Sequence, residues 1–244
     1  MTRIFQECTL HPSQILGELA LGESQSHHLS VVLRMGVGEA VTVFNGLGGE
    51  YQGTISAIKK KRVWVSLAKF LPIERESPLK VILAQSICRG EKMDFVVQKA
   101  VELGVTGIVP VLSEKQAFKL KPDAQTKKIA HWQAVAVSAC EQSGRNTVPK
   151  VYPALALSQL KASHTVDHYL CLSPEAKTTL AHCNFAASAS ILAIIGPEAG
   201  FSEAEISYLL KNNFVALNLG HRILRTETAG MALLAILQHN FGDI

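Results

Sequence analysis

The sequence lacks most features that would mark a secreted, membrane-bound or metal-dependent protein. Its five cysteines are an odd number, lie far apart and form no CxxC pair. They therefore indicate neither a disulfide framework nor a zinc site, and free thiols in a reducing cytoplasm are expected. No apolar run approaches the roughly 18 residues needed to cross a bilayer. The opening stretch MTRIFQECTL also lacks the apolar segment of a secretory signal. A cytoplasmic protein that does not enter a membrane is therefore predicted.

Several catalytic signatures are missing as well. The chain has no GxxxxGK[ST] phosphate-binding loop, no GxGxxG turn after the first strand of its second part and no GxSxG nucleophile elbow. His164 and His168 are four residues apart, and His182 precedes Cys183, but further ligands at a zinc-like spacing complete neither pair. These absences disfavour a P-loop nucleoside triphosphatase, a dinucleotide-binding enzyme, a covalent hydrolase and a metal site.

What the sequence does contain is a β-rich first part. Hydrophobic residues make up 48% of the chain and charged residues 18%, which is typical of an ordered globular protein. Apolar residues alternate with others in residues 39–45 and 62–70, and residues 50–58 fit a partner strand. The segments NGLGG and KKKR supply the turns. Because residues 24–35 have helical spacing instead, the pattern predicts a small barrel or meander with one helix.

After Pro78 the pattern changes to strands that alternate with helices, and residues 71–78 are expected to link the two parts. Ser202 and Glu205 form a capping box at the start of one helix. Alternation of this kind predicts an α/β fold with a mostly parallel sheet covered on both faces. The domains are expected at residues 1–72 and 73–244. The strands of the second domain are expected at residues 79–86, 107–113, 167–173, 190–195 and 214–220, and its helices at 91–104, 123–144, 202–213 and 228–241.

Basic charge is concentrated in one stretch. Residues 59–128 hold 15 Lys or Arg and 7 Asp or Glu, although the whole chain carries a net charge of only +4. Such a concentration suits a protein that binds a polyanion through phosphate contacts, which give affinity without reading sequence. The alternative is a solvated surface whose KKKR segment closes a hairpin. Charge alone leaves both interpretations open.

Loops after three of the predicted strands have compositions that suit a ligand site. They are CLSPEAK, GPEAGFS and GHRILRTETAG, and each would lie at the carboxyl edge of a parallel sheet, where ligands bind. Glu198 in the middle of the GPEAG turn would repel a phosphate. A ligand with an ammonium or sulfonium charge, or one held by backbone groups, fits better. The alternative is a plain tight turn whose glycines adopt backbone angles closed to other residues.

The third loop brings charged side chains to the start of the most apolar helix. Arg222, Arg225 and Glu227 stand beside Thr226 and Thr228. Charged groups at such a place need a partner or an opening to solvent. They could belong to a capped helix entry in which Arg and Glu pair. They could instead line a pocket, with a cation for an anionic substrate and a carboxylate for proton transfer.

Five stretches together resemble one family. HHLSVVLRMGVGE, CRGEKMDFVVQKAVELGV, ACEQSGRNTVP, IGPEAGFSEAE and LGHRILRTETA occur in order, cover nearly the whole chain and are similar to the bacterial 16S ribosomal RNA uracil-N3 methyltransferases of the SPOUT superfamily. The resemblance implies an N-terminal PUA-like β-barrel that helps bind RNA, then an α/β domain with a C-terminal trefoil knot. It also implies a homodimer without a metal, which uses S-adenosylmethionine to methylate 16S rRNA within the 30S subunit. Ala199 departs from the family, which usually has a glycine there.

The resemblance also implies roles for individual residues. Glu198 is the first choice for the base that removes the N3 proton and Glu227 the second, while Arg225 and Arg3 would stabilise negative charge on the uracil oxygens. The donor site is expected to consist of Leu172, Ser173, Ile195, Gly196, Pro197, Gly200, Leu219, Gly220, Ile223, Leu224, Thr228 and Ala229. RNA contacts are expected from Arg3, Arg34, Lys59, Lys60, Lys61, Arg62, Arg89 and Lys92.

The sequence also allows structural roles for two of these residues and other functions for the chain. Glu198 could bond backbone amides of its own turn, and Arg225 could pair with Glu227. The alternative functions are another SPOUT RNA methyltransferase that modifies a ribose 2′ oxygen, and a non-catalytic RNA-binding or ribosome-assembly module.

Overall fold

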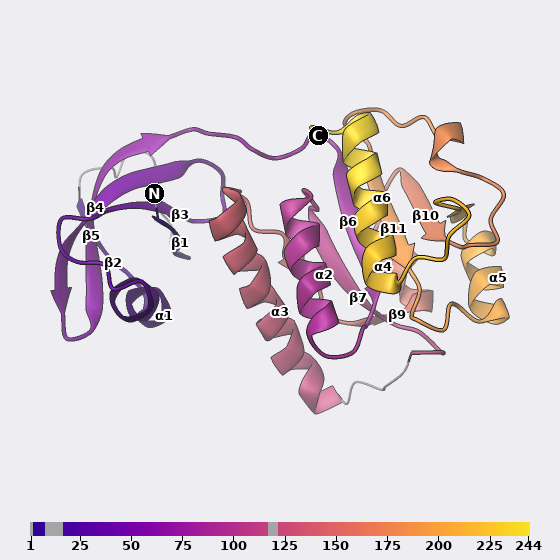
Figure 1. Cartoon of the computed structure of the whole chain (residues 1–244), viewed down its shortest axis with the longest axis horizontal. Coiled ribbons are helices and arrows are strands. Elements are labelled where there is room, and N and C mark those ends of the chain that lie inside the picture. Colours follow the sequence, from indigo (N-terminus) through magenta and orange to yellow (C-terminus); the bar gives the residue numbers. More distant parts are fainter. Residues whose placement is uncertain (1, 8–16, 117–121) are drawn as a thin grey trace. The chain divides into compact units, whose positions relative to one another are not determined.

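The computed structural model describes residues 2–7, 17–116 and 122–244. The chain forms two compact units (Figure 1). The first comprises residues 1–76 and 140–148, and the second comprises residues 77–139 and 149–244. The sequence places the domain boundary between residues 72 and 73. In the structure this boundary lies between residues 76 and 77. The larger difference from the expected division is that residues 140–148, from the middle of the chain, also belong to the first unit.

The first unit is built on a five-stranded sheet in the order β1-β3-β4-β5-β2, in which β1 and β3 are parallel and the other neighbours antiparallel. The three strands predicted for this part are confirmed. Two further strands, each only four residues long, escape the alternation pattern. The strands are β1 (Thr2–Phe5), β2 (Gly17–Ala20), β3 (Ala40–Phe44), β4 (Glu50–Lys59) and β5 (Arg62–Leu71).

A helix covers one side of this sheet. It consists of α1 (Glu23–His27) and a π-helical turn (His28–Val32), which confirms helical structure over most of residues 24–35. Leu29 of the π-helical turn is fully buried and belongs to the same core cluster as Val41 and Val65 of the sheet. The helix is therefore held by burial of its apolar side rather than by length, because isolated helices this short are unstable in water.

The KKKR segment closes the β4–β5 hairpin, as predicted. Lys60 and Lys61 form the turn with φ angles of +50° and +65°. Turns of this kind normally use Asn-Gly, because a side chain in the left-handed region is strained. Lys59 and Arg62 pair across the ends of the two strands. The hairpin thus presents four adjacent cations at its tip. Its turn would be more stable with Asn-Gly in place of Lys60 and Lys61.

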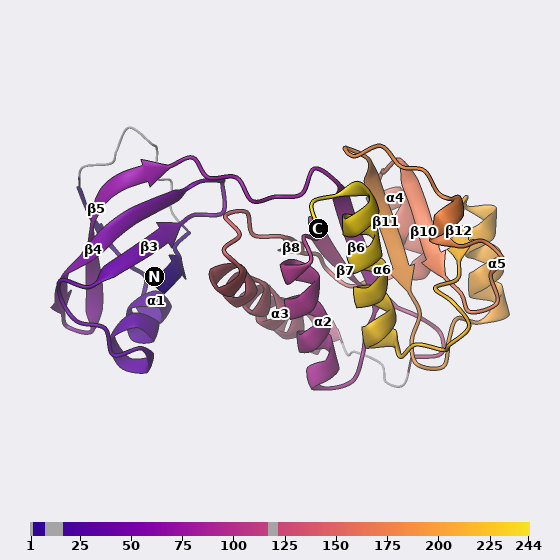
Figure 2. The same cartoon turned by 45° about the horizontal axis from the view of Figure 1, so that its top comes forward.

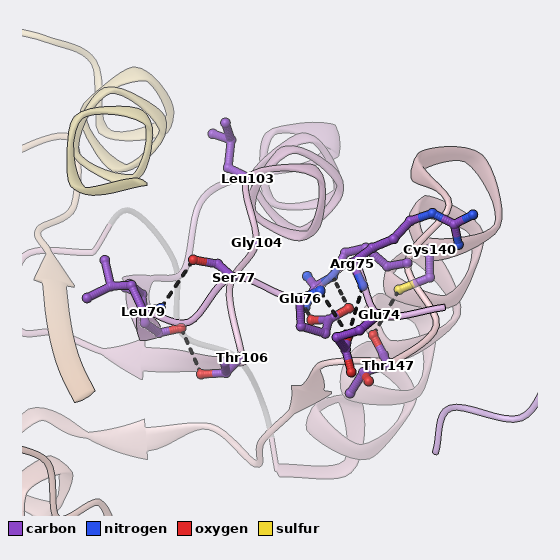
Figure 3. A network of polar contacts seen from close by, with 12 residues as sticks. Glu74, Arg75, Glu76, Ser77, Leu79, Leu103, Gly104, Thr106, Cys140 and Thr147 are labelled. Carbon is purple, nitrogen blue, oxygen red and sulfur yellow. Dashed lines mark hydrogen bonds and ion pairs between the residues drawn. The ribbon is translucent and has the colours of Figure 1, made fainter. Parts of the chain in front are cut away.

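The segment that ends the first unit is ordered by polar contacts (Figure 3). The carboxylate of Glu74 accepts hydrogen bonds of 2.9 Å from the backbone N–H groups of both Arg75 and Glu76. Glu76 forms an ion pair with Arg145, and Asn146 donates to the carbonyl of Ile73 at 3.0 Å. The contacts of Arg145 and Asn146 attach residues 140–148 to the segment 73–76. The predicted linker is therefore a structured segment up to Glu76.

The second unit is an α/β fold with a seven-stranded sheet. The order is β12-β10-β11-β6-β7-β8, with β9 beside β7, and every neighbouring pair is parallel. The predicted parallel sheet and its five strands are confirmed, and two strands of two residues each are additional. The strands are β6 (Lys80–Ser86), β7 (Gly107–Leu112), β8 (Lys150–Val151), β9 (Leu155–Ala156), β10 (His168–Leu172), β11 (Ser190–Ile195) and β12 (Val215–Leu217).

Helices cover both faces of this sheet (Figures 1 and 2). On one face Leu160 of α4 and Leu209 of α5 pack with Val109 and other strand residues. On the opposite face α6 lies beside α2, and its Gly230 approaches Leu83 and Ile195 of the sheet. The capping box at the start of α5 is confirmed. The helices are α2 (Glu91–Glu102), α3 (Pro122–Ser143), α4 (Leu160–Ser163), α5 (Glu203–Lys211) and α6 (Thr226–Phe241).

The described cysteines are free thiols, as predicted, and Cys8 lies outside the described residues. Burial raises the pKa of Cys140 to about 12 and that of Cys171 to about 11, which makes both thiols unreactive at neutral pH. In the described part of the chain, no helix has the length and apolarity needed to span a membrane.

Candidate functional site

A cavity of about 810 Å³ lies at the carboxyl edge of the parallel sheet in the second unit. Its walls are the loops that follow β10, β11 and β12, with further side chains from the start of α2 and the loop after β7. The three loops that the sequence selects as a composite pocket therefore meet. This is the position at which parallel sheets bind ligands.

Eleven of the twelve residues that the sequence assigns to the donor site line this cavity. The exception is Thr228, which is exposed on the first turn of α6. Convergence on one cavity is what a shared ligand requires, while the individual contacts stay a prediction. The eleven are Leu172, Ser173, Ile195, Gly196, Pro197, Gly200, Leu219, Gly220, Ile223, Leu224 and Ala229.

The GPEAG turn is shaped by its glycines. The N–H of Gly200 donates to the carbonyl of Pro197 at 2.9 Å, and Gly200 has a φ of +70°, where a side chain would be strained. A Cβ at Gly196 would lie 3.2–3.4 Å from the Phe201 ring. Ala199 is exposed, and its φ is not positive. The departure from a second glycine in this turn therefore causes no backbone strain.

Two buried polar side chains fix the turn to the start of α6. The hydroxyl of Thr226 donates to the carbonyl of Gly196 at 2.6 Å, and the amide of Gln85 donates to that hydroxyl at 2.9 Å. Gln85 is fully buried and Thr226 is 5% exposed, so these bonds are protected from water. Sequence reasoning missed Gln85. The available signal was a glutamine near the end of an apolar strand, where a buried polar group needs a partner.

Asn218 connects the first and third loops of the cavity. Its side chain donates to the carbonyl of Pro174 at 2.7 Å and accepts from the N–H of Gly220 at 2.6 Å. Its own N–H donates to the carbonyl of Thr178 at 2.9 Å. Asn218 was not predicted, although an asparagine two residues before a glycine is a recognisable turn signal. The first and third loops are thus held together by one residue, through its side chain and its backbone.

Lys115 is a cation of the cavity wall that sequence reasoning missed. It follows β7, lines the cavity and donates to the carbonyl of Phe201 at 3.2 Å. The neighbouring Glu114 donates its N–H to the buried carboxylate of Glu205 at 2.9 Å. The loop after β7 is therefore attached to the segment that follows the GPEAG turn. Because the loop after β7 leaves the carboxyl edge of the parallel sheet, Lys115 could have been added to the predicted pocket from the sequence.

The charged residues at the cavity meet around one lysine. Lys92 Nζ lies 3.3 Å from Glu227 Oε1 and 3.6 Å from Glu198 Oε1. Burial disfavours the ionised form of Glu227, but hydrogen bonds from its own N–H and from Lys92, with the nearby charge of Arg225, outweigh burial and lower its pKa. The ion-pair partner of Glu227 is therefore Lys92, which the sequence assigns to RNA. Arg225 is exposed at the cavity wall and is the N-cap residue of α6.

Arg3 belongs to the first unit, where it is largely buried. It forms an ion pair with Glu50 and donates to the carbonyl of Arg145 at 3.1 Å and to the side-chain oxygen of Asn146 at 2.7 Å. Its guanidinium also lies 4.9 Å from the centroid of the Phe44 ring. These contacts are those of a structural residue. A role for Arg3 in catalysis or RNA binding stays a prediction.

The other residues assigned to RNA are divided between the units. Arg34 is exposed after the π-helical turn with a φ of +55°. The cations of the KKKR hairpin are exposed as well, and the Nε of Arg62 donates to the carbonyl of Leu21 at 3.2 Å. Arg89 is exposed in the loop between β6 and α2 of the second unit. Among the described residues, no three His, Cys, Asp or Glu side chains gather in a way that could hold a metal ion.

Family comparisons cover both units of the chain. A model described as the RNA methyltransferase domain matches residues 75–238. A model described as the RNA methyltransferase PUA domain matches residues 21–68, which indicates that the first unit is PUA-like.

Relatives of similar length also match from end to end. Ribosomal RNA small subunit methyltransferase E of Buchnera aphidicola is 35% identical over 99% of this chain and 97% of its own. The protein of the same name from Bacillus subtilis is 29% identical over 98% of this chain and 96% of its own.

Solved structures resemble the whole chain. A methyltransferase from Legionella pneumophila, in complex with the cofactor SAM, has a TM-score of 0.95 and 39% identity, covering 100% of this chain and 99% of its own. Ribosomal RNA small subunit methyltransferase E from Neisseria gonorrhoeae, bound to S-adenosyl methionine, has a TM-score of 0.91 and 35% identity at the same coverage.

Proposed function

The chain belongs to the RNA methyltransferase family of the ribosomal RNA small subunit methyltransferases E, and from this premise we propose that it methylates N3 of a uridine in 16S rRNA with S-adenosylmethionine as donor. The observation that carries the proposal is the cavity at the carboxyl edge of the sheet, where eleven of the expected donor residues meet Glu198 and Lys92, and Lys92 also pairs with Glu227. A ribosomal substrate also places the reaction in the cytoplasm.

The cavity suits this donor in size and chemistry. Its volume of about 810 Å³ is within the range of small-molecule sites, which usually have apolar walls and a few fixed polar groups. Leu172, Leu219 and Leu224 supply apolar surface for a flat base, and the turn at Gly196 offers backbone groups for hydrogen bonds. When bound, S-adenosylmethionine supplies a methyl group activated by the positive charge on its sulfur. The protein then has to align that group with the acceptor nitrogen.

Proton removal is the second task of the site, because the lone pair of N3 is available only as its weakly acidic proton leaves. The carboxylate of Glu198 would take the N3 proton, and the donor held by the cavity walls would supply the methyl group to N3 and keep the electron pair of its carbon–sulfur bond on sulfur. The guanidinium of Arg225 stabilises the negative charge that develops on the adjacent carbonyl oxygens. Glu227, whose carboxylate also pairs with Lys92, is the second candidate for the base.

The proposal includes the C-terminal trefoil knot and the homodimer. The sheet order supports a knot, because the chain forms β12 at one edge and then returns over β11 and β6 as α6. Exposed apolar side chains support a dimer: Phe95 on α2 is 46% exposed and Ile236 on the adjacent α6 is 37% exposed. A partner that covers these two helices would remove that surface from water.

Methylation of 30S particles tests the function directly. Particles that lack the modification are incubated with the protein and donor, and the nucleosides of their 16S rRNA are then separated. We expect 3-methyluridine as the product, and a ribose-methylated nucleoside would contradict the proposal. Calorimetry with S-adenosylmethionine provides a second measurement, because a folded dimer that does not bind the donor would indicate a non-catalytic assembly module.

The KKKR hairpin provides a test of RNA binding by the first unit. Changing the turn to Lys60→Asn/Lys61→Gly should raise stability by about 1 kcal/mol or more, because strain in the left-handed region is relieved. It should also lower RNA affinity and reduce the slope of log K against log salt by about 1.4–1.8, the contribution of two phosphate contacts. Filter binding at several salt concentrations and urea unfolding measure the two effects.

A matched variant separates the two effects. Lys60→Gln/Lys61→Gln removes the same two charges but keeps side chains at both positive φ angles. It should lose RNA affinity to a similar degree without the gain in stability. An unchanged salt slope in both variants would show that the hairpin does not contact phosphates.

A further inference from the structure

Three charged groups, two in the cavity wall and one paired with it through Lys92, come from three separate elements. Lys92 lies in the first turn of α2, Glu198 in the turn after β11 and Glu227 in the first turn of α6. The lysine Nζ is within 3.3–3.6 Å of an oxygen of each carboxylate. The side chains of Lys92 and Glu198 are 39% and 37% exposed, and that of Glu227 is 14% exposed. One cation thus stands between two acids at the site where a proton has to be moved.

The backbone around Lys92 holds it at this place. The chain leaves β6 through Gly90, which has a φ of +57° and is the N-cap residue of α2. Met93, directly after the lysine, and Val96, about one helical turn further on, are fully buried. Glu227 is fixed from its own side, since its carboxylate accepts a hydrogen bond from its own N–H. The position of the lysine is therefore set by the strand-to-helix connection and the core, and not by the carboxylates.

We propose that Lys92 is a positioning residue for methyl transfer, whose positive charge holds the carboxylates of Glu198 and Glu227 in fixed orientation. This inference rests on the proposed function in assigning a base to the pair. The sequence assigns Lys92 to RNA binding because of its charge. We instead assign it to the group of charged residues at the cavity. Lys92 acts through the two carboxylates and is not itself a proton acceptor.

Removing Lys92 takes away the opposite charge that stabilises the ionised form of Glu227, because the hydrogen bond and the charge of the lysine both lower the pKa of that carboxyl. A protonated carboxylate cannot accept the N3 proton. The charge of Arg225 also lowers the pKa of Glu227, but it contributes less than the hydrogen bond and the charge of Lys92. Burial raises the pKa of Cys88 to about 11, which leaves that thiol neutral.

The experiment compares Lys92→Met with Lys92→Arg in the full-length protein. Carbon-13 NMR of the glutamate side chains, recorded without donor or RNA, follows the titration of the carboxyl groups. We expect Lys92→Met to raise the pKa of Glu227 by about one unit, the usual effect of losing an opposite charge at this distance. Single-turnover methylation should also become slower, because Glu198 loses the contact with Lys92 that orients it. Lys92→Arg should keep the wild-type titration and the wild-type rate of methylation.

Lys99→Met is the matched control. Lys99 lies on the same helix, is 36% exposed and forms an ion pair of 2.8 Å with Glu102, so the variant loses a similar pair away from the cavity lining. It should change neither the Glu227 titration nor the rate of methylation. A Glu227 titration that is unchanged in Lys92→Met overturns the proposal. If that variant does not fold, Lys92→Gln takes its place with the same expected and contradicting results. Because the NMR measurement needs neither donor nor RNA, it remains decisive even if the assignment of the methylated atom is wrong.

Discussion

Replacing Glu198 by glutamine is expected to lower turnover about 10²- to 10⁴-fold at saturating donor and RNA, the usual contribution of a general base. Glutamine has nearly the same size and shape as glutamate but cannot accept the N3 proton. The affinity for S-adenosylmethionine should change much less, because the cavity walls and the backbone of the turn remain. Single-turnover kinetics give the rate of methylation, and calorimetry gives the affinity for the donor.

Glu175→Gln is the control for this experiment. Glu175 is exposed, follows β10 and lines the same cavity, but its carboxylate is not part of the ion pairs with Lys92. It should retain nearly normal turnover. Normal turnover in Glu198→Gln would show that Glu198 is not the base, and Glu227→Gln would then be the variant expected to lose activity.

The main features of the fold could be predicted because they depend on local pattern. Alternation of apolar residues marks β3, β4 and β5, and the change to alternating strands and helices after Pro78 predicts the parallel sheet. The strands that were missed have two to four residues each. Over so short a length a period of two cannot be distinguished from chance, so only pairing with a neighbour reveals them.

The cavity could be located because loops after parallel strands meet at one edge, whatever their separation in sequence. What could not be predicted is which side chains face one another there. Gln85 and Thr226 are 141 residues apart in the chain, and no pattern in either segment points to the other. Lys92 illustrates the same limit, because its charge suggests RNA whereas its contacts are with the carboxylates of the cavity.

Arg3 shows that long-range contacts can give a residue a structural role that its sequence context does not reveal. From sequence it is a cation near the N-terminus of an RNA-modifying enzyme. In the structure it belongs to a network with Glu50 and Asn146, and the latter lies 143 residues away. The segment 140–148 is therefore part of the first unit because polar groups there complete the bonding of Arg3, Glu76 and Ile73.

Changing Arg3 to methionine is accordingly expected to destabilise the first unit by about 3 kcal/mol, because removing one partner of a buried ion pair leaves the other poorly compensated. The carboxylate concerned is Glu50, which is 6% exposed and retains only Arg75, at 3.0 Å. Urea unfolding measures the loss. Arg75→Met is the comparison and should cost less, since Arg75 is 38% exposed whereas Arg3 is 13% exposed.

The dependence of this loss on pH distinguishes the ion pair from simple packing. Burial raises the pKa of Glu50, but hydrogen bonds and charge from Arg75 and Arg3 more than offset burial, so its pKa in the folded protein lies below its ordinary value. The stabilisation by ionised Glu50 is therefore present above the ordinary glutamate pKa and disappears as the pH falls through the folded-state value. The stability difference between the wild-type protein and Arg3→Met should accordingly narrow on acidification. If the variant instead keeps its stability at every pH but loses methylation, Arg3 acts in the reaction and not in the structure of the first unit.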